Sequence, residues 1–589
     1  MNPSTALARV VVDELVRNGL AHVVLAPGSR SAPLAMALAD ADAGGLLTLH
    51  VRVDERSAAF TALGLATSSG VPAAVVTTSG TAVANLHPAV LEAHHGNVPL
   101  LLLTADRPDE LRGVGANQTT EQVGIFGGSV RLFREFSAPD VRTGQVPYWR
   151  STISRAWLAA AGALSDDPGP VHVDVAFRDP LVPTDDDVWV ESLDGRPDGR
   201  PWTAAGAQAA ASLDWSGFGD EAETLLVLGD TTRRLAAAAW RLADRLSWPV
   251  IAEPQCRGGG AAIACSPLVA GSEGWVRRNP PRRILVVGRP TLSRQIARLV
   301  GGGIAPVDVV TSGPRWPDAA HAARRVHTAV ALHLSSLNKS ASSDPITPLN
   351  AEIFSEDGGL AAGARLRSAW IAAGEQARIV VDRILDENLT STPPPSGIAA
   401  TREVLRCLPQ DAVLFLGSSS VIRDVDLLGE QLPGLVLTNR GVGGIDGTVS
   451  SAVGVALADA ATVRPAYAIM GDLAFLHDAN GLVIGPREPR PDLCIVVLND
   501  DGGGIFALLE QGAPEYSGVF ERVFGTSHAV DIEALCAATR TPFQRVEVEK
   551  LEAALAPQPG LRVVEVRVDR HHHRELHAGL RLEVAAALT

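Results

Sequence analysis

The chain has 589 residues, of which 46% are hydrophobic and 20% charged, and its formal net charge is −15. This length is enough for three or four domains that each bury a core. The composition excludes disordered and fibrous proteins. The acidic balance argues against a nucleic-acid-binding protein, which usually carries a basic face, so we expect no nucleic-acid partner.

Cysteine usage and hydropathy favour a cytoplasmic protein. The five cysteines are odd in number and form no Cys-x-x-Cys pair, which argues against a disulfide framework and against a zinc site. No apolar run approaches the roughly 18 residues of a membrane-spanning helix. Asp13 and Glu14 precede any long apolar stretch, so we expect neither a signal peptide nor a membrane span.

The first segment alternates strands and helices. It opens with a predicted helix at Thr5–Asn18. Short apolar runs separated by helix-length segments indicate a parallel sheet that is covered on both faces. Such runs predict strands at His22–Ala26, Leu49–Val53, Ala73–Thr77, Pro99–Thr104 and Val171–Val175.

The second segment follows a linker rich in Asp, Pro and Gly at Pro180–Pro201. It has no Gly-x-Gly-x-x-Gly motif after its first strand, so a dinucleotide site is not supported there. The segment ends in the polar residues Ser335–Pro348, a helical stretch at Leu360–Leu389 and a stiff connector at Ser391–Ser396. Strands are predicted at Leu225–Leu228, Val250–Ala252, Ile284–Val287 and Val307–Val310.

The third segment repeats the same alternation, so we expect an α/β protein with three doubly wound parallel-sheet domains. Ligands of such sheets bind beyond the carboxyl ends of the strands. Strands are predicted at Val413–Leu416, Leu435–Thr438, Ala466–Ile469, Cys494–Leu498, Phe543–Val548 and Leu561–Val568.

Oxygen-bearing residues follow two strands of the third segment. Gly471 and Asp472 end one strand, and Asn499, Asp500 and Gly502 follow the next, one crossover later. Mg²⁺ prefers oxygen ligands, which Asp472, Asn499 or Asp500, and the carbonyl of Gly502 could supply. The sequence leaves the choice between Asn499 and Asp500 open. On its own the pattern also fits an N-capping acid and a glycine-rich turn.

This stretch resembles the diphosphate and metal motif of the thiamine-diphosphate-dependent decarboxylase superfamily. Leu473 stands where that family usually has Gly, and Asp500 where it usually has a second Asn. The resemblance implies thiamine diphosphate and Mg²⁺ or Mn²⁺ as cofactors. It also implies a pyrimidine-binding domain at 1–185, a central domain at 200–345, a linker with a helical stretch at 346–396 and a diphosphate-binding domain at 397–589.

Glu55 follows a predicted strand in the sequence Val-Asp-Glu-Arg. Alone, it fits an acid that pairs with Arg52 or Arg56 at the start of a helix. The resemblance instead places Glu55 where the family has its catalytic Glu, against the cofactor's aminopyrimidine. Because the pyrimidine domain of one subunit faces the diphosphate domain of another in this superfamily, the resemblance implies a homodimer or homotetramer.

Six further motifs resemble one family of this superfamily, whose members act in menaquinone biosynthesis. They are APGSRSAPL at 26–34, TTSGTAVAN at 77–85, TADRP at 104–108, GANQ at 115–118, SSSVIR at 418–423 and NRGVGGIDG at 439–447. The resemblance implies decarboxylation of 2-oxoglutarate and transfer of the remaining carbon chain to isochorismate. It places substrate-binding positions at Ser29, Arg30, Arg107, Asn117, Gln118, Ser419, Arg423 and Arg440.

Four arginines in this set suit substrates that bring two carboxylates each, because a guanidinium binds a carboxylate with two parallel hydrogen bonds. Only two of the 51 basic residues are lysine, which we attribute to codon bias. The resemblance places the cofactor against Glu55, Ser79, Gly80, Gly417, Ile445, Gly471, Asp472, Leu473, Asn499, Gly503, Ile505 and Phe506.

Two alternative functions remain open from the sequence. One is another 2-oxo-acid decarboxylase or acetolactate-synthase-like ligase, and the other is a catalytically silent relative. The central segment is either scaffold or the place of a regulatory pocket. At the C-terminal end, His573 and His577 have a metal-compatible i, i+4 spacing, but with His571 and His572 beside them we expect a solvated helix start.

Overall fold

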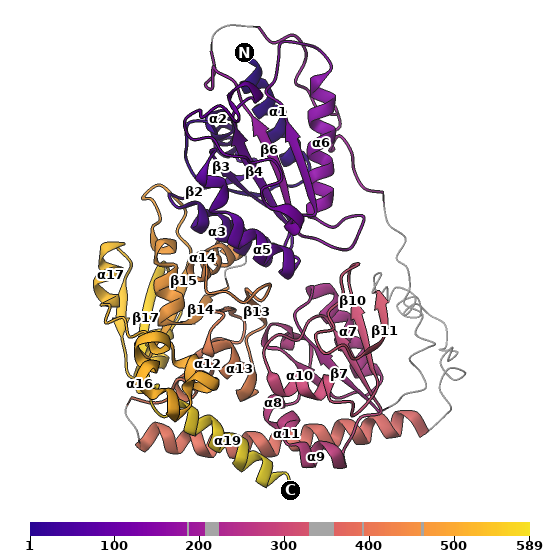
Figure 1. Cartoon of the computed structure of the whole chain (residues 1–589), viewed down its shortest axis with the longest axis vertical. Helices are drawn as coiled ribbons and strands as arrows, with labels where there is room; N and C mark the ends of the chain where they lie inside the picture. The colour runs from indigo at the N-terminus through magenta and orange to yellow at the C-terminus, as the bar shows by residue number, and fades with distance from the viewer. Residues whose placement is uncertain (185–187, 207–222, 329–357, 392–393, 461–463) are drawn as a thin grey trace.

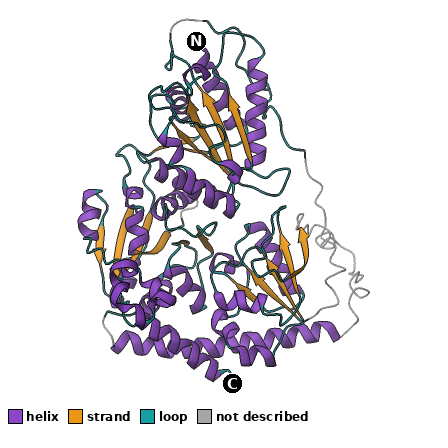
Figure 2. Cartoon of the chain, viewed as in Figure 1, coloured by secondary structure: helices purple, strands orange, loops and turns teal. Residues whose placement is uncertain are grey.

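The structure is a computed structural model of the chain that describes residues 1–184, 188–206, 223–328, 358–391, 394–460 and 464–589. Within these residues lie three β-sheets whose strands all pair in parallel, with helices packed on both faces of each sheet (Figures 1 and 2). This arrangement confirms the predicted α/β class with three parallel-sheet domains.

The first sheet has the strand order β2-β1-β3-β4-β6-β5. Its strands are β1 (His22–Leu25), β2 (Thr48–Val51), β3 (Ala73–Thr77), β4 (Leu100–Asp106), β5 (Leu132–Phe136) and β6 (Pro170–Ala176). The helices are α1 (Pro3–Arg17), α2 (Ala32–Ala43), α3 (Glu55–Ser69), α4 (Thr81–Ala84), α5 (His87–Gly96) and α6 (Gln145–Ala160). Because β1, β3 and β4 are buried and adjacent, the loops that follow them meet at one edge of the sheet.

The second sheet has the order β11-β10-β9-β7-β8. Its strands are β7 (Thr224–Leu228), β8 (Val250–Ala252), β9 (Arg283–Val287), β10 (Val307–Thr311) and β11 (Ala323–Thr328). The helices are α7 (Arg233–Arg245), α8 (Ser266–Gly271), α9 (Glu273–Arg278) and α10 (Arg294–Gly301). The long helix α11 (Gly358–Ser391) then runs beneath both this domain and the third one (Figure 1).

The third sheet has the order β13-β12-β14-β15-β17-β16. Its strands are β12 (Val413–Leu416), β13 (Leu435–Thr438), β14 (Ala466–Gly471), β15 (Leu493–Asn499), β16 (Phe543–Arg545) and β17 (Leu561–Arg567). Its α-helices are α12 (Gly397–Cys407), α13 (Ser420–Leu428), α14 (Thr448–Asp459), α15 (Asp472–His477), α16 (Ser517–Phe520), α17 (Ile532–Ala538), α18 (Leu551–Leu555) and α19 (His573–Ala587).

Every predicted strand is present, with ends that shift by three residues or fewer. Two strands were not predicted, β5 and β11. Both lie at sheet edges and carry charged residues in place of an apolar run, because an edge strand is covered on fewer sides. The expected boundaries at residues 185 and 345/346 fall outside the described residues.

The first and third domains meet at a close crossing of α3 and α14. A side chain at Gly64 in α3 would place its Cβ 2.1 Å from the carbonyl oxygen of Ser451 in α14, so only glycine permits this approach. Ser451 also donates a hydrogen bond from its Oγ to the carbonyl of Phe60, at 3.3 Å. The crossing therefore fixes the orientation of α3, the helix that begins at Glu55.

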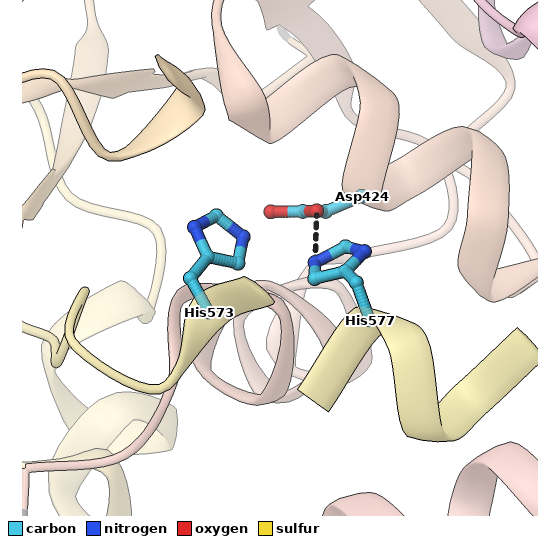
Figure 3. Close-up of side chains that lie close together, drawn as sticks. All are labelled: Asp424, His573 and His577. Atoms are coloured by element: carbon cyan, nitrogen blue, oxygen red, sulfur yellow. Dashed lines mark ion pairs between the residues drawn. The ribbon is translucent and has the colours of Figure 1, made fainter. Parts of the chain in front are cut away.

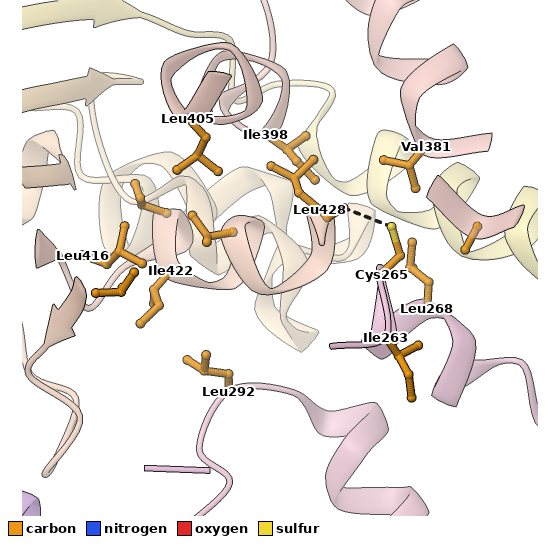
Figure 4. Close-up of a cluster of buried hydrophobic side chains, with 14 of the residues drawn as sticks. Ile263, Cys265, Leu268, Leu292, Val381, Ile398, Leu405, Leu416, Ile422 and Leu428 are labelled. Carbon is orange, nitrogen blue, oxygen red and sulfur yellow. Dashed lines mark hydrogen bonds between the residues drawn. The ribbon is translucent and has the colours of Figure 1, made fainter. Parts of the chain in front are cut away.

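One hydrophobic core joins the central domain, α11 and one face of the third sheet (Figure 4). Cys265 of the central domain donates a hydrogen bond from its Sγ to the carbonyl of Leu428 at the end of α13, at 3.1 Å. The central domain is thus packed as a continuous body with the third domain. Among the described residues, no helix has the length and apolar character needed to cross a bilayer.

Candidate active site

A cavity of about 250 Å³ lies at the carboxyl ends of β12, β14 and β15 in the third domain. It occupies the position where parallel sheets bind ligands. Of the residues predicted from the sequence, the following line it: Ser419, Arg423, Ile445, Gly471, Asp472, Leu473, Asp500, Gly502, Gly503, Ile505 and Phe506. The diphosphate and metal motif therefore surrounds one cavity.

Asp472 is held in a single orientation at the end of β14. Its Oδ2 accepts hydrogen bonds from the backbone N–H of Gly502 at 2.8 Å and from His528 Nε2 at 3.0 Å. His528 Nδ1 accepts the N–H of Val530 at 3.0 Å, which leaves its Nε2 as the donor. Burial raises the pKa of Asp472, and the hydrogen bonds from His528 and Gly502 oppose that shift.

Asn499 and Asp500 point in different directions at the end of β15. The Asn499 side chain donates from Nδ2 to Glu565 Oε1 at 2.6 Å, and its Oδ1 accepts the N–H of Asp501 at 2.9 Å. Asp500 instead lines the cavity. Its burial, followed by the repulsion from Asp472, raises the pKa of Asp500 to about 7.

Two carboxyl groups that face one cavity, with Asp472 repelling Asp500, fit a divalent cation. The cation would neutralise the repulsion that adds to the effect of burial on the pKa of Asp500. The backbone of Gly502 also reaches this place because its φ of +150° and its close approach to Gly525 both require glycine. Asp472, Asp500 and the Gly502 carbonyl are therefore the oxygen donors that the structure offers to a metal.

Ser419 and Arg423 form the wall at the start of α13. Ser419 caps this helix through its Oγ, which accepts the N–H of Val421 at 3.3 Å. Arg423 donates to the Ser419 carbonyl at 2.8 Å. Burial and the neighbouring Arg440 lower the pKa of Arg423. A second guanidinium thus stands near the first, as a site for an anion requires.

Arg440 is positioned by the central domain. Its Nε donates to Thr291 Oγ1 at 3.1 Å and its Nη2 to the Thr291 carbonyl at 3.2 Å. Arg289 donates to the Arg440 carbonyl at 2.5 Å. Buried Glu253 accepts N–H bonds from Thr291 and, at 2.9 Å, from Leu292. Arg440 lies beside the cavity and contacts the hydroxyl of Ser418, another lining residue, at 3.4 Å.

A second cluster lies at the corresponding edge of the first sheet. Arg107 Nη1 donates to Ser79 Oγ and, at 2.7 Å, to the carbonyl of Gln118. Gln118 Nε2 in turn donates to the Ser79 carbonyl at 3.2 Å. Arg30 donates to the carbonyl of Phe177 at 3.0 Å. Burial and the charge of Arg30 lower the pKa of Arg107.

The remaining predicted residues are either exposed or held in turns and strand ends. Ser29 and Asn117 are exposed. The N–H of Gly80 donates to Gln122 Oε1 at 2.9 Å, which ties the Ser79–Gly80 turn to a buried polar network under the sheet. In the third domain, Gly417 packs between β12 and β14, below the cavity.

Glu55 lies apart from the cavity of its own chain. It is the first residue of α3, whose N-cap is Asp54. It lines a separate, open hollow of about 460 Å³ with Asp54, Arg56, Asn85 and Asn480. The structure thus brings together the diphosphate-domain residues and, separately, the arginine cluster of the first domain, but it leaves Glu55 outside both.

Several residues at the site were not predicted. His528 and Glu565 fix Asp472 and Asn499, and Thr291 and Glu253 position Arg440. They lie far from their partners in the sequence, so no local motif indicates them. The expected solvated helix start is wrong for His573 and His577, which are 4% and 5% exposed.

Two parts of the chain match families of cofactor-binding domains. Residues 5–125 match the thiamine pyrophosphate enzyme N-terminal TPP binding domain, and residues 426–566 match the corresponding C-terminal TPP binding domain. The fold resembles the crystal structure of benzoylformate decarboxylase from Polynucleobacter necessarius, with a TM-score of 0.66, 19% identity and coverage of 97% of this chain and 99% of that one. The two domain matches, on this fold, define a thiamine pyrophosphate enzyme.

Full-length relatives narrow this class. The chain is 46% identical to the 2-succinyl-5-enolpyruvyl-6-hydroxy-3-cyclohexene-1-carboxylate synthase of Saccharopolyspora erythraea, with both chains covered completely. The enzymes of the same name from Nocardia farcinica and Rhodococcus erythropolis are each 44% identical, with 99% of this chain and 100% of theirs covered. The chain belongs to the 2-succinyl-5-enolpyruvyl-6-hydroxy-3-cyclohexene-1-carboxylate synthase family.

Proposed function

We propose that this protein is a transferase that makes 2-succinyl-5-enolpyruvyl-6-hydroxy-3-cyclohexene-1-carboxylate and CO₂ from 2-oxoglutarate and isochorismate in menaquinone biosynthesis. The observation that carries this proposal is the 46% identity over the full length of a synthase of that name. The two arginine pairs, Arg423 with Arg440 and Arg30 with Arg107, support it because both substrates are dicarboxylic acids.

The cavity of the third domain is our proposed site for the diphosphate and its metal. Asp472, Asp500 and the Gly502 carbonyl would hold Mg²⁺ or Mn²⁺, both of which accept oxygen ligands. We assign the metal to Asp500 rather than Asn499, because the Asn499 amide is already bonded to Glu565. Bound thiamine diphosphate supplies the carbon nucleophile and the electron sink for decarboxylation. Ile445, Ile505 and Phe506 form the apolar wall beside it.

The protein's own residues orient the acids. Arg423 and Arg440 stand at the rim of the cavity, where they bind carboxylates with charge-assisted hydrogen bonds. Arg107 and Arg30, together with Ser29, Asn117 and Gln118, offer a second set of donors on the first domain. The arginines among these donors are held by buried or partly buried contacts, which lowers the entropy cost of orienting each substrate.

We also propose that the working unit is a homodimer, or a homotetramer built from such dimers. Glu55 lines a hollow other than the Asp472 cavity of the same chain, which supports a site completed by Glu55 of a second copy. The five cysteines are free thiols, which supports our assignment to the cytoplasm.

Complementation tests the dimer. Glu55→Gln and Asp472→Asn copies are each expected to be inactive. Co-expressed with different tags and purified as a hybrid, they leave one site with both Glu55 and Asp472, so up to about half the wild-type rate per dimer returns. A hybrid as inactive as its parents would overturn the shared site.

The activity itself is tested with 2-oxoglutarate, isochorismate, Mg²⁺ and thiamine diphosphate. CO₂ release and the mass of the adduct are measured, with Asp472→Asn as the negative control. Pyruvate in place of 2-oxoglutarate distinguishes an acetolactate-synthase-like ligase. Preference for pyruvate, or absence of an adduct from folded, cofactor-loaded protein, would contradict the proposal.

A further inference from the structure

Three buried polar side chains meet between α13 and α19 (Figure 3), and two of them, Asp424 and His573, line the proposed cofactor cavity. Asp424 comes from α13, and His573 and His577 come from successive turns of α19. Their candidate ligand atoms all lie within 4.8 Å of one another. Asp424, His573 and His577 are 2%, 4% and 5% exposed, respectively. A carboxyl group and two imidazoles thus face one another away from bulk water.

The facing atoms have no hydrogen-bond partner among the described residues. These atoms are Asp424 Oδ1, His573 Nε2 and His577 Nε2. His577 Nε2 and Asp424 Oδ1 are 3.6 Å apart, which is too long for a hydrogen bond. Buried polar atoms are almost always satisfied in folded proteins, so three that converge on one point indicate a missing partner.

Acidic and basic groups both lie around the cluster. Asp500 and Arg423 lie near Asp424, Asp569 lies near His573, and Arg581 lies near His577. Burial lowers the pKa of His573 to about 4 and holds that of His577 well below its usual value, so both imidazoles are neutral near pH 7. A neutral imidazole presents a lone pair, which is the form that binds metals.

The backbone of Gly504 lies close to the ring of His573 and opposes the lowering of its pKa. The ring nitrogen of His573 that has no hydrogen-bond partner among the described residues is Nε2. Metal-bound histidines characteristically donate their other ring N–H to a carbonyl, which leaves the Nε2 lone pair for the metal. His573 and Asp424 also line the cavity, so a further coordination position opens into it.

We propose that Asp424, His573 and His577 form a binding site for a divalent transition-metal ion of the Zn²⁺ type. It is separate from the magnesium site, because imidazole nitrogens suit Zn²⁺ and Co²⁺ whereas Mg²⁺ prefers oxygen. Zinc–ligand distances of about 2.0–2.2 Å place tetrahedral ligands roughly 3.4 Å apart, so the side chains close inward on binding. The metal ties the C-terminal helix α19 to α13 beneath the cavity.

The test is Co²⁺ binding to the full-length protein, stripped of metal and then saturated with Mg²⁺ and thiamine diphosphate to occupy the oxygen site. We expect one Co²⁺ per chain with visible d–d absorption of a nitrogen-ligated site, displaced by Zn²⁺. Zn²⁺ alone should also raise the unfolding temperature and remain bound through gel filtration, as measured by elemental analysis.

Two variants and one control decide the outcome. His577→Gln and the isosteric Asp424→Asn should each weaken Co²⁺ binding at least roughly tenfold. The double variant His571→Ala/His572→Ala changes only the exposed neighbours of the cluster and should bind as the wild type does. Each variant is checked for the wild-type fold by circular dichroism.

Absence of a Co²⁺ signal in the wild type would overturn the proposal. So would equal binding by wild-type protein and folded Asp424→Asn, or loss of binding only in the His571→Ala/His572→Ala control. None of these results depends on the proposed catalytic activity, because binding and thermal stability are the quantities measured.

Discussion

Asp472 and Asp500 follow neighbouring parallel strands and turn their carboxyl groups into one cavity. Removal from water, followed by repulsion from Asp472, raises the pKa of Asp500 to about 7, and burial raises the pKa of Asp472. Asn499, although adjacent in sequence, bonds to Glu565 beneath the sheet. Our proposed metal site therefore takes Asp472 and Asp500 as ligands and leaves Asn499 a structural role.

Asp500→Asn and Asn499→Ala should therefore have different effects. Asp500→Asn is expected to weaken Mg²⁺ binding at least roughly tenfold, because it removes a charged ligand. Asn499→Ala should instead lower the free energy of unfolding by about 1–3 kcal/mol, because Glu565 loses a buried donor. Mg²⁺ titration of the activity and urea unfolding separate the two. A large rise in Mg²⁺ requirement from Asn499→Ala alone would reverse our assignment.

We predict that Glu253 makes the free energy of unfolding depend on pH. Burial, with Asp426 and Asp230 nearby, raises the pKa of Glu253 to about 7, while backbone N–H bonds and Arg440 oppose that shift. Because the folded state holds this proton more tightly than the unfolded chain, the contribution of Glu253 to stability falls as pH rises from about 4.5 to about 7.

Glu253→Gln removes this dependence. Between pH 5 and pH 8 the wild type should lose stability relative to Glu253→Gln, by an amount on the order of 3 kcal/mol. Urea unfolding at both pH values measures the difference, with exposed Glu121→Gln as the matched control. Parallel pH profiles for wild type and Glu253→Gln would contradict the role of Glu253.

The sequence predicted the fold because buried parallel strands are continuous apolar runs, as in β3 and β15. It missed β11, whose charged edge sequence lacks such a run. The strand-end residues Asp472 and Asp500 were predictable for the same reason: a parallel strand delivers its next residue to a common edge.

Contacts between distant parts of the chain were not predictable in this way. Thr291 reaches Arg440 across two domains, and His528 reaches Asp472 from a loop without a motif. The burial of His573 and His577 depends on how α19 docks against α13, which helix periodicity does not indicate. Local sequence thus indicates which residues end a strand. The packing of distant elements against one another decides which residues hold those strand-end side chains in position.

The third prediction tests the central domain as a positioning element for Arg440. Thr291→Val removes the Oγ1 acceptor of Arg440 but keeps the carbonyl acceptor. We expect KM for one of the two acids to rise about 3- to 10-fold with little change in kcat, and Arg440→Lys to raise it about 10- to 100-fold. Thr539→Val, at the end of α17, is the remote control. Unchanged KM values in Thr291→Val would show that Arg440 does not depend on this contact.

The fourth prediction tests the helix crossing that orients Glu55. Gly64→Ala would place a methyl group 2.1 Å from the Ser451 carbonyl, so α3 and α14 must separate. We expect a loss of at least about 1–3 kcal/mol in the free energy of unfolding. Gly579→Ala in α19 is the matched control: nothing lies within 4 Å of its Cβ, so the better helix propensity of alanine should add about 0.5–1 kcal/mol. If both variants shift the urea midpoint in the same direction, the close crossing does not set the distance between the two domains.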